Sequence, residues 1–214
     1  MSGINVNPTR MELNKLKKKL QSARRGHKLL KDKRDELIRQ FMILIKENNL
    51  LRHEVETAIG EANKYMAVAG SVMQQEVLDT ALMLPRQEVE IEVAGKNVMS
   101  VNVPEFRIVY KSDDKNIFSY GTAFTSSDLD GAVIALSEVL PKMIRLAEVE
   151  KTCQLMAEEI EKTRRRVNAL EHIMIPDYEQ AIRYITMKLS ENERNTTTSI
   201  MKVKDMVLKQ KYKY

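Results

Sequence analysis

The chain has 214 residues, of which 30% are charged and 5% aromatic, with no Trp, and its formal net charge is +5 at pH 7. This composition suits a long, narrow apolar seam better than a thick globular core. No apolar run approaches the roughly 18 residues that span a bilayer, and the N-terminus lacks the charged-then-apolar pattern of a signal peptide. We therefore expect a soluble intracellular protein that reaches a membrane only through a partner.

The N-terminal segment predicts a helix from about residue 8 to about residue 83, beginning at Asn7-Pro8 and stopped by Pro85. Thirteen of sixteen positions spaced 3 and 4 residues apart are apolar, a heptad repeat typical of a coiled coil. These seam positions are Leu13, Leu16, Leu20, Ala23, His27, Leu30, Arg34, Leu37, Phe41, Leu44, Asn48, Leu51, Val55, Ala58, Ala62 and Tyr65.

The insert at about 85–127 has the alternation of strands. Apolar and acidic residues alternate over 88–93, residues 94–97 supply turn chemistry, and 98–103 returns as a partner strand. This pattern predicts a β-hairpin, with 106–110 as a further extended piece. Because an isolated hairpin is marginal in water, we expect it to lean on the helices or on another protein.

The C-terminal segment predicts a second helix from about 128 to about 208, opened by a capping box at Ser127 and Asp130. Its heptad positions are Ala132, Leu136, Val139, Met143, Leu146, Glu150, Cys153, Ala157, Ile160, Arg164 and Val167, after which the register shifts through Leu170, Met174, Tyr178, Ala181, Ile185 and Leu189. Pro141 and Pro176 lie inside it, either as tolerated kinks or as points of designed curvature. Cys153 on the seam predicts a buried, inert thiol in a reducing compartment.

Two such helices joined by a compact middle most simply fold back as an antiparallel coiled coil. The predicted fold class is therefore mainly α: a long antiparallel two-helix coiled coil of the N- and C-terminal helices, with a small β-hairpin insert. Its expected segments are 1–84, 85–127 and 128–214.

The charge is unevenly distributed along the chain. Residues 10–39 carry twelve Lys/Arg against four Asp/Glu, and residues 200–214 carry five Lys against one Asp. In an antiparallel hairpin the two termini share one end, so we expect a basic tip and an acidic remainder.

Motifs of catalysis are missing from the sequence. It contains no phosphate-binding loop, no H-E-x-x-H, no paired-cysteine metal spacing and no nucleophile elbow. His27, His53 and His172 are scattered, and a packed or partner-facing His27 is favoured over a ligand. We expect no catalytic residues, no cofactor and no metal.

Several motifs resemble the D subunit of the V-type ATPases. They are residues 7–13 (NPTRMEL), 26–37 (GHKLLKDKRDEL), 146–152 (LAEVEKT), 163–171 (TRRRVNALE), Ile175-Pro176 and 191–194 (ENER). Together they cover both helical segments, about three-quarters of the chain, and the insert carries little of the likeness.

The resemblance implies a central rotor axle that transmits torque between a catalytic hexamer and a membrane ion-translocating ring. It implies a non-catalytic component on the cytoplasmic side of the membrane. The implied partners are the F subunit of the central stalk, the alternating catalytic and regulatory subunits of the hexamer, and the component that links to the membrane ring, with no nucleic acid.

Two surfaces are the candidate sites within this interpretation. The basic tip would face the catalytic head through Arg10, Arg24, Arg25, Lys28, Lys202, Lys204 and Lys209. The hairpin near 88–103 would modulate coupling rather than hold the fold, through Val89, Ile91, Val93, Gly95, Val101 and Val103.

Two rivals remain open from the residues alone. The basic window could neutralise nucleic-acid phosphates, although it lacks interleaved aromatic residues and a recognised binding module. A scaffold that forms a parallel homodimer would show the same heptads.

Overall fold

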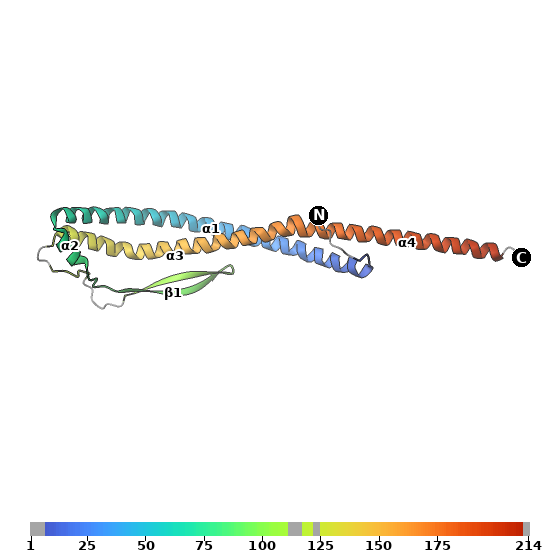
Figure 1. The fold of residues 1–214 in the computed structure, drawn as a ribbon, viewed down its shortest axis with the longest axis horizontal. Coiled ribbons are helices and arrows are strands. Elements are labelled where there is room, and N and C mark those ends of the chain that lie inside the picture. The colour runs from blue at the N-terminus through green and yellow to red at the C-terminus, as the bar shows by residue number, and fades with distance from the viewer. Residues whose placement is uncertain (1–6, 111–116, 122–124, 212–214) are drawn as a thin grey trace. The chain divides into compact units, whose positions relative to one another are not determined.

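The computed structural model describes residues 7–110, 117–121 and 125–211. Its elements are α1 (Arg10–Val72), α2 (Gln75–Leu82), β1 (Val89–Val98), β2 (Val101–Tyr110), α3 (Ser127–Ala169), η1 (Leu170–Met174) and α4 (Ile175–Lys211), shown in Figure 1. The predicted fold class is confirmed: long helices at both ends of the chain pack antiparallel, and a two-stranded hairpin lies between them in the sequence.

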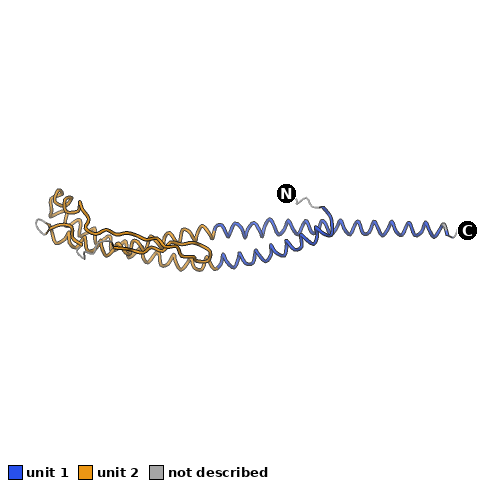
Figure 2. Tube along the Cα trace, turned by 90° about the horizontal axis from the view of Figure 1, so that it is seen from below, with its two compact units in different colours: residues 1–35, 161–214 blue, residues 36–160 orange. Residues whose placement is uncertain are grey.

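The chain forms two compact units, coloured separately in Figure 2. Unit 1 contains residues 1–35 and 161–214, and unit 2 contains residues 36–160. Both α1 and α3 contribute to each unit. Unit 1 holds 23 Lys/Arg and 10 Asp/Glu, whereas unit 2 holds 12 and 20, so the expected separation of charge follows the division into units.

In unit 1 the first part of α1 packs antiparallel against η1 and α4. Its core consists of the buried residues Leu16, Ala181 and Ile185, with Leu13, Tyr178, Ile182 and Leu189 packed around them. All seven lie on the predicted seam except Ile182. Burial of this narrow apolar strip, rather than a broad core, holds the pair together.

In unit 2 the remainder of α1 packs against α3, and the hairpin lies on both. One core cluster joins Leu37 of α1, Met156 of α3 and Val101 and Val103 of β2. A second cluster joins Ala69, Ala81 and Leu129 where α1, α2 and α3 meet.

The predicted seam of α1 is confirmed at its fully buried positions from Leu16 to Ala62. It fails at Tyr65, which is 48% exposed, because Ala69 takes the inward position there.

The seam of α3 differs from the prediction by one residue at every second position. Val149, Met156 and Thr163 are buried, whereas the predicted Glu150, Ala157 and Arg164 are exposed. Thr163 takes one of these inward positions, and Thr152 is also buried, beside the half-buried Cys153. The Thr152 hydroxyl donates to the carbonyl of Glu148 at 2.8 Å, so a polar side chain is satisfied within its own helix.

The first helix is shorter than predicted. It stops at Val72, and the short α2 follows after a break at Met73 and Gln74. The N-terminal caps of the two long helices also differ from the predicted ones by one or two residues. Thr9, not Asn7, accepts the Glu12 N–H at 3.3 Å, and Ser126, not Ser127, accepts the Asp128 N–H at 3.2 Å.

The predicted turn of the hairpin is wrong. Residues 94–97 belong to β1, and the turn is Met99-Ser100, with φ of 51° and 70°. Two successive positive φ values define the type I′ turn that matches the twist of a two-residue hairpin. The Asn97 side chain substitutes for the usual glycine chemistry, because its Oδ1 accepts the Ser100 N–H at 3.0 Å and its Nδ2 donates to Asn102 Oδ1 at 2.8 Å.

The two prolines of the second helical segment are handled differently. Pro141 lies within α3, whereas Pro176 follows η1, a single π-helical turn in which the Ile175 N–H donates to the Leu170 carbonyl. A π turn accommodates one extra residue in a helix. Here it ends at Met174, two residues before Pro176, whose nitrogen has no hydrogen to donate. The kink expected at Pro176 is thus a π turn.

Candidate functional site

Exposed basic and apolar surfaces are the main candidate sites among the described residues. Among them, no group of three or more His, Cys, Asp or Glu side chains could hold a metal ion. No helix in the described ranges is long and apolar enough to cross a membrane. Cys153 is half-buried, and burial together with the charges of Glu47 and Glu150 raises the pKa of its thiol, so this cysteine is a poor nucleophile at neutral pH.

Three interhelical contacts lie along the predicted basic surface of unit 1. Arg10 pairs with Glu193 at 2.6 Å and Arg24 with Glu179 at 2.7 Å, while His27 Nε2 lies 3.3 Å from a Glu171 oxygen. These pairs are partly or fully exposed, so each contributes little to stability. They nevertheless fix the antiparallel alignment, in which residue 10 lies beside residue 193.

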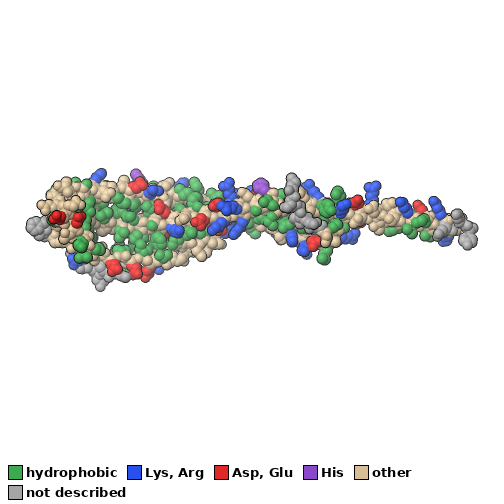
Figure 3. Space-filling model, in the orientation of Figure 1, with side chains coloured by type: hydrophobic (Ala, Val, Ile, Leu, Met, Phe, Trp, Pro, Cys, Tyr) green, Lys and Arg blue, Asp and Glu red, His purple; other side chains and the backbone are tan. Residues whose placement is uncertain are grey.

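The predicted head-facing residues are only partly brought together. Arg24, Arg25 and Lys28 line one shallow groove of about 330 Å³ with Lys17, Leu20 and Gln21. Arg10 lies 14 residues before Arg24 on the same helix, which is about 21 Å along the axis. The seven basic residues therefore form a line along unit 1 rather than one patch, and Figure 3 shows Lys and Arg side chains recurring along this unit.

The last part of α4 has no partner within the described chain. Because Arg10, at the start of α1, already lies beside Glu193, the residues that follow extend beyond the paired region. Every residue from 190 to 209 is exposed. Besides Lys202, Lys204 and Lys209, this stretch carries six exposed apolar residues: Ile200, Met201, Val203, Met206, Val207 and Leu208.

This exposed apolar stretch is a site that the sequence analysis missed. The predicted helices, over about 8–83 and about 128–208, are nearly equal in length, so their pairing alone gave no signal for it; the contact between Arg10 and Glu193 reveals it. Exposed apolar residues on an unpaired helix mark a surface that another protein covers. We call residues 194–211 the free end of α4.

In unit 2 the hairpin is fastened by its turn end. Val101 and Val103 are 7% and 5% exposed and pack on the helices, so these two predicted coupling residues belong to the core. Val89, Ile91 and Val93 lie on the opposite face of the hairpin, and Gly95 lies within β1 opposite Pro104. The predicted set therefore divides between a packed face and an open face.

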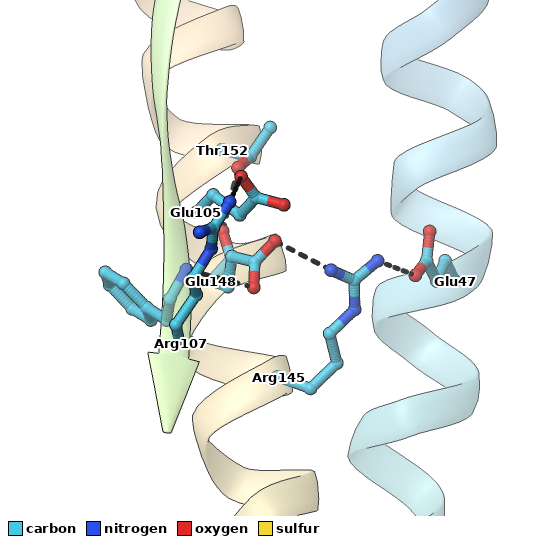
Figure 4. Close-up of polar contacts among 7 residues, drawn as sticks. Glu47, Glu105, Arg107, Arg145, Glu148 and Thr152 are labelled. Atoms are coloured by element: carbon cyan, nitrogen blue, oxygen red, sulfur yellow. Dashed lines mark hydrogen bonds and ion pairs between the residues drawn. The ribbon is translucent and has the colours of Figure 1, made fainter. Parts of the chain in front are cut away.

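A polar network ties the hairpin to both helices (Figure 4). Arg145 of α3 contacts Glu47 of α1 at 3.0 Å and Glu148 of its own helix at 2.7 Å. The hydrogen bond to Glu47 and the charge of Glu148 raise the pKa of Arg145. Glu148 also accepts the Phe106 N–H of β2 at 3.4 Å, so one carboxylate connects the strand to the helix pair.

Figure 3 shows hydrophobic side chains gathered on the visible face of unit 2. The exposed large apolar residues of α1 and α3 in this unit include Ile38, Met42, Ile43, Leu50, Ile134, Leu136, Leu140 and Met143. A groove of about 320 Å³ lies between the hairpin, α1 and α3; its lining is mixed, with apolar residues such as Ile43 and Val149 beside the charged Arg145 and Glu148. So much exposed apolar surface is typical of a chain that works inside an assembly.

Comparison with known proteins gives a consistent family. The sequence model of the family described as the D subunit of ATP synthase matches residues 12–205. The chain is 55% identical over 209 residues to the V-type ATP synthase D subunit of Clostridioides difficile (strain 630), covering 98% of this chain and 94% of that protein. It is 54% identical over 215 residues to the V-type ATP synthase D subunit of Acetivibrio thermocellus, covering 100% and 97%. The relative in Thermoanaerobacter sp. (strain X514), with the same name, is 54% identical over 209 residues, covering 98% and 100%.

Proposed function

The chain belongs to the D-subunit family of the ATP synthases and is a non-catalytic central-stalk component of a V-type rotary complex, and we propose that it transmits torque through the free end of α4. The observation that carries this proposal is the free end itself, an unpaired stretch of helix that is exposed throughout residues 194–209 and carries both apolar and basic side chains. We expect a surrounding protein to cover the exposed apolar side chains of such a helix.

The paired helices suit this task physically. A coiled coil resists bending and twisting because each helix is hydrogen-bonded within itself and locked to its partner along the seam. Its surface is asymmetric around the axis. Three equivalent sites around it would therefore meet different contacts, and a partner shifts an equilibrium only through such differences.

The basic line of unit 1 supports contact with the catalytic head. Arg25 and Lys28 are exposed, and they lie near Arg24, which pairs with Glu179. The other three basic residues, Lys202, Lys204 and Lys209, lie on the free end of α4. We propose that acidic loops of the catalytic and regulatory subunits face them, because complementary charge speeds and orients association.

The remaining partners follow from the family. We propose that the F subunit of the central stalk and the component that links to the membrane ring contact unit 2, on the cytoplasmic side of the membrane. The exposed apolar residues of unit 2 support this assignment. We propose further that segments 1–84 and 128–214 act as the axle and that segment 85–127, with its hairpin, tunes coupling.

Affinity purification of the tagged chain from detergent-solubilised membranes of its own cells tests this function. Mass spectrometry should identify a P-loop ATPase subunit, its regulatory partner and the small F subunit. Recovery of nucleic acid only, or of the chain only as a homodimer, would refute the rotor assignment.

A set of charge-neutral variants tests the head-facing surface. Replacing Arg25, Lys28, Lys202, Lys204 and Lys209 together by Gln should weaken assembly with the catalytic subunits and lower the ATPase rate of the reconstituted complex. The matched control replaces Lys64 and Lys142, two exposed lysines of unit 2, by Gln. Equal behaviour of the two sets would contradict the assignment.

A further inference from the structure

The hairpin has two edges whose backbone groups can be assigned from its register. In a two-residue hairpin the residues that flank the turn form a hydrogen-bonded pair, and bonded and non-bonded pairs then alternate. The flanking pair is Val98 and Val101. The pairs 91–108, 93–106 and 95–104 are then non-bonded, so their N–H and C=O groups point outward, away from the partner strand.

The outward edge of β2 is already closed. Pro104 has no N–H to offer, and its place in a non-bonded pair explains why a proline is tolerated there. The Phe106 N–H, which also points outward, donates to Glu148 of α3 at 3.4 Å. That bond independently supports the assigned alternation.

The outward edge of β1 is open over the same length. Val89, Ile91 and Val93 present their N–H and C=O groups there, and no hydrogen bond beyond the β1–β2 ladder reaches these groups from the described residues. None of the ten residues of β1 is buried. A long, regular edge with unpaired backbone groups is a template for another strand, and its charged side chains restrict which strands can add to it.

The side chains beside this edge define what would bind. Ile91 and Val93 are 44% and 67% exposed, and with Phe106, Ile108 and Tyr110 of β2 they form an apolar face that does not pack on the helices. The other face of β1 carries Glu90 and Glu92. Residues directly opposite on a neighbouring strand favour opposite charge and like polarity.

We propose that the β1 edge receives an extended segment of another protein of the rotary complex, which adds to the hairpin as a third strand. Its residue opposite Glu92 is Lys or Arg, and those opposite Ile91 and Val93 are apolar. The partner's identity as a component of the complex rests on the proposed function. The backbone bonds would fix its register, and the acidic and apolar faces of β1 would select it.

Amide hydrogen exchange at single-residue resolution tests the proposal directly. In the isolated chain the amides of Glu90 and Glu92 should exchange slowly, because they lie in the β1–β2 ladder, and those of Ile91 and Val93 should exchange fast. In the purified complex, exchange at Ile91 and Val93 should slow by at least about tenfold, which corresponds to about 1.4 kcal/mol of protection by new hydrogen bonds. Fast exchange at both residues in the complex would overturn the proposal.

A cross-strand pair of variants supplies the matched control. Ile91→Pro and Ile108→Pro each remove one outward N–H and one isoleucine from the same face at the same level of the hairpin. Only Ile91→Pro closes the β1 edge. It should lower retention of the partner segment, measured by photo-cross-linking from position 93, whereas Ile108→Pro should leave the cross-link in place.

The outcomes separate this proposal from the proposed function. Purification of the complex with its P-loop ATPase subunit establishes the function before exchange is measured. Equal loss of the cross-link in both variants, or a cross-link to a helical segment of the partner, would overturn strand addition while leaving the rotor assignment intact.

Discussion

At the scale of single residues, the core of unit 2 depends on Leu37 and Met156, which are both fully buried. They fill the space between the helices and the hairpin residues Val101 and Val103. Leu37 lies on the seam of the coiled coil and also contacts the hairpin, so the packing of the hairpin and the packing of the helices depend on the same side chain.

Leu37→Ala should therefore destabilise the protein by about 2–5 kcal/mol, the usual cost of a cavity at a buried leucine. Urea unfolding followed by circular dichroism measures this change. The matched control is Leu50→Ala on the same helix, where the side chain is 69% exposed and little stability should be lost. A loss at Leu37 no larger than that at Leu50 would contradict the described core.

Tyr120 is a second residue whose environment has a measurable consequence. Its hydroxyl donates to Asp130 Oδ1 at 2.8 Å. Burial first, and then the hydrogen bond to Asp130, raise the pKa of Tyr120 above its usual value near 10. Because the folded pKa is higher than the unfolded one, this contribution to stability is complete below pH 10 and is lost as the pH rises further.

Absorbance of the phenolate at alkaline pH tests this statement. The difference between the wild-type protein and Tyr120→Phe should show one tyrosine that ionises later than the others. The variant should also lose less stability than the wild type as the pH rises above about 10. A difference curve centred near pH 10 would show that Tyr120 is solvated and unbonded.

At the scale of elements, the backbone of the hairpin turn is strained, although neither of its two residues is a glycine. Met99 and Ser100 both have positive φ, a conformation that glycine adopts freely and other residues adopt at a cost of about 1–2 kcal/mol. Met99 packs against the core, which offsets its strain, but the exposed Ser100 has no such compensation apart from its bond to Asn97.

Ser100→Gly should accordingly raise the free energy of unfolding by about 0.5–1 kcal/mol, because glycine fits this backbone without the steric penalty. Ser100→Val, a β-branched residue in the same place, should lower it. Thermal unfolding monitored by circular dichroism distinguishes the two. An unchanged midpoint in both variants would mean that the turn adopts another conformation in solution.

At the scale of the whole molecule, the two units carry opposite net charge and different kinds of exposed surface. Unit 1 is basic and includes the free end of α4, whereas unit 2 is acidic and includes the open edge of the hairpin. No described residue after Ile185 is buried, so the free end contributes no buried side chain to the core.

Removing residues 196–214 should thus change the free energy of unfolding by less than about 1 kcal/mol, since no buried side chain is lost. The same truncation should abolish stable assembly with the catalytic subunits, measured by co-purification. Intact assembly of the truncated chain would contradict the role given to the free end, and global unfolding would contradict the described boundary of the core.

The sequence by itself determined the helical class, the hairpin and the separation of charge, and it favoured antiparallel pairing without excluding a parallel homodimer. Each of these is a repeated signal: a heptad seam summed over many turns, a strand alternation, or a run of like charges. Repetition survives single exceptions, as His27 and Arg34 show within the seam of α1. The resemblance to the D-subunit family rested on the same two helical segments.

The tertiary structure decided what depends on single atoms and on neighbours distant in sequence. The register of α3 depended on which residues find space between the helices, and a polar residue such as Thr152 is acceptable inside because its hydroxyl bonds within its own helix. The turn at Met99-Ser100 is held by side-chain bonds of Asn97 to Ser100 and Asn102, which depend on the hairpin's register. The open edge of β1 also depends on the tertiary structure. Pro104 and Glu148 close the edge of β2, and this leaves β1 with the outward backbone groups that have no partner in the described chain. Whether a backbone group is paired depends on its neighbours in space, which the sequence does not specify.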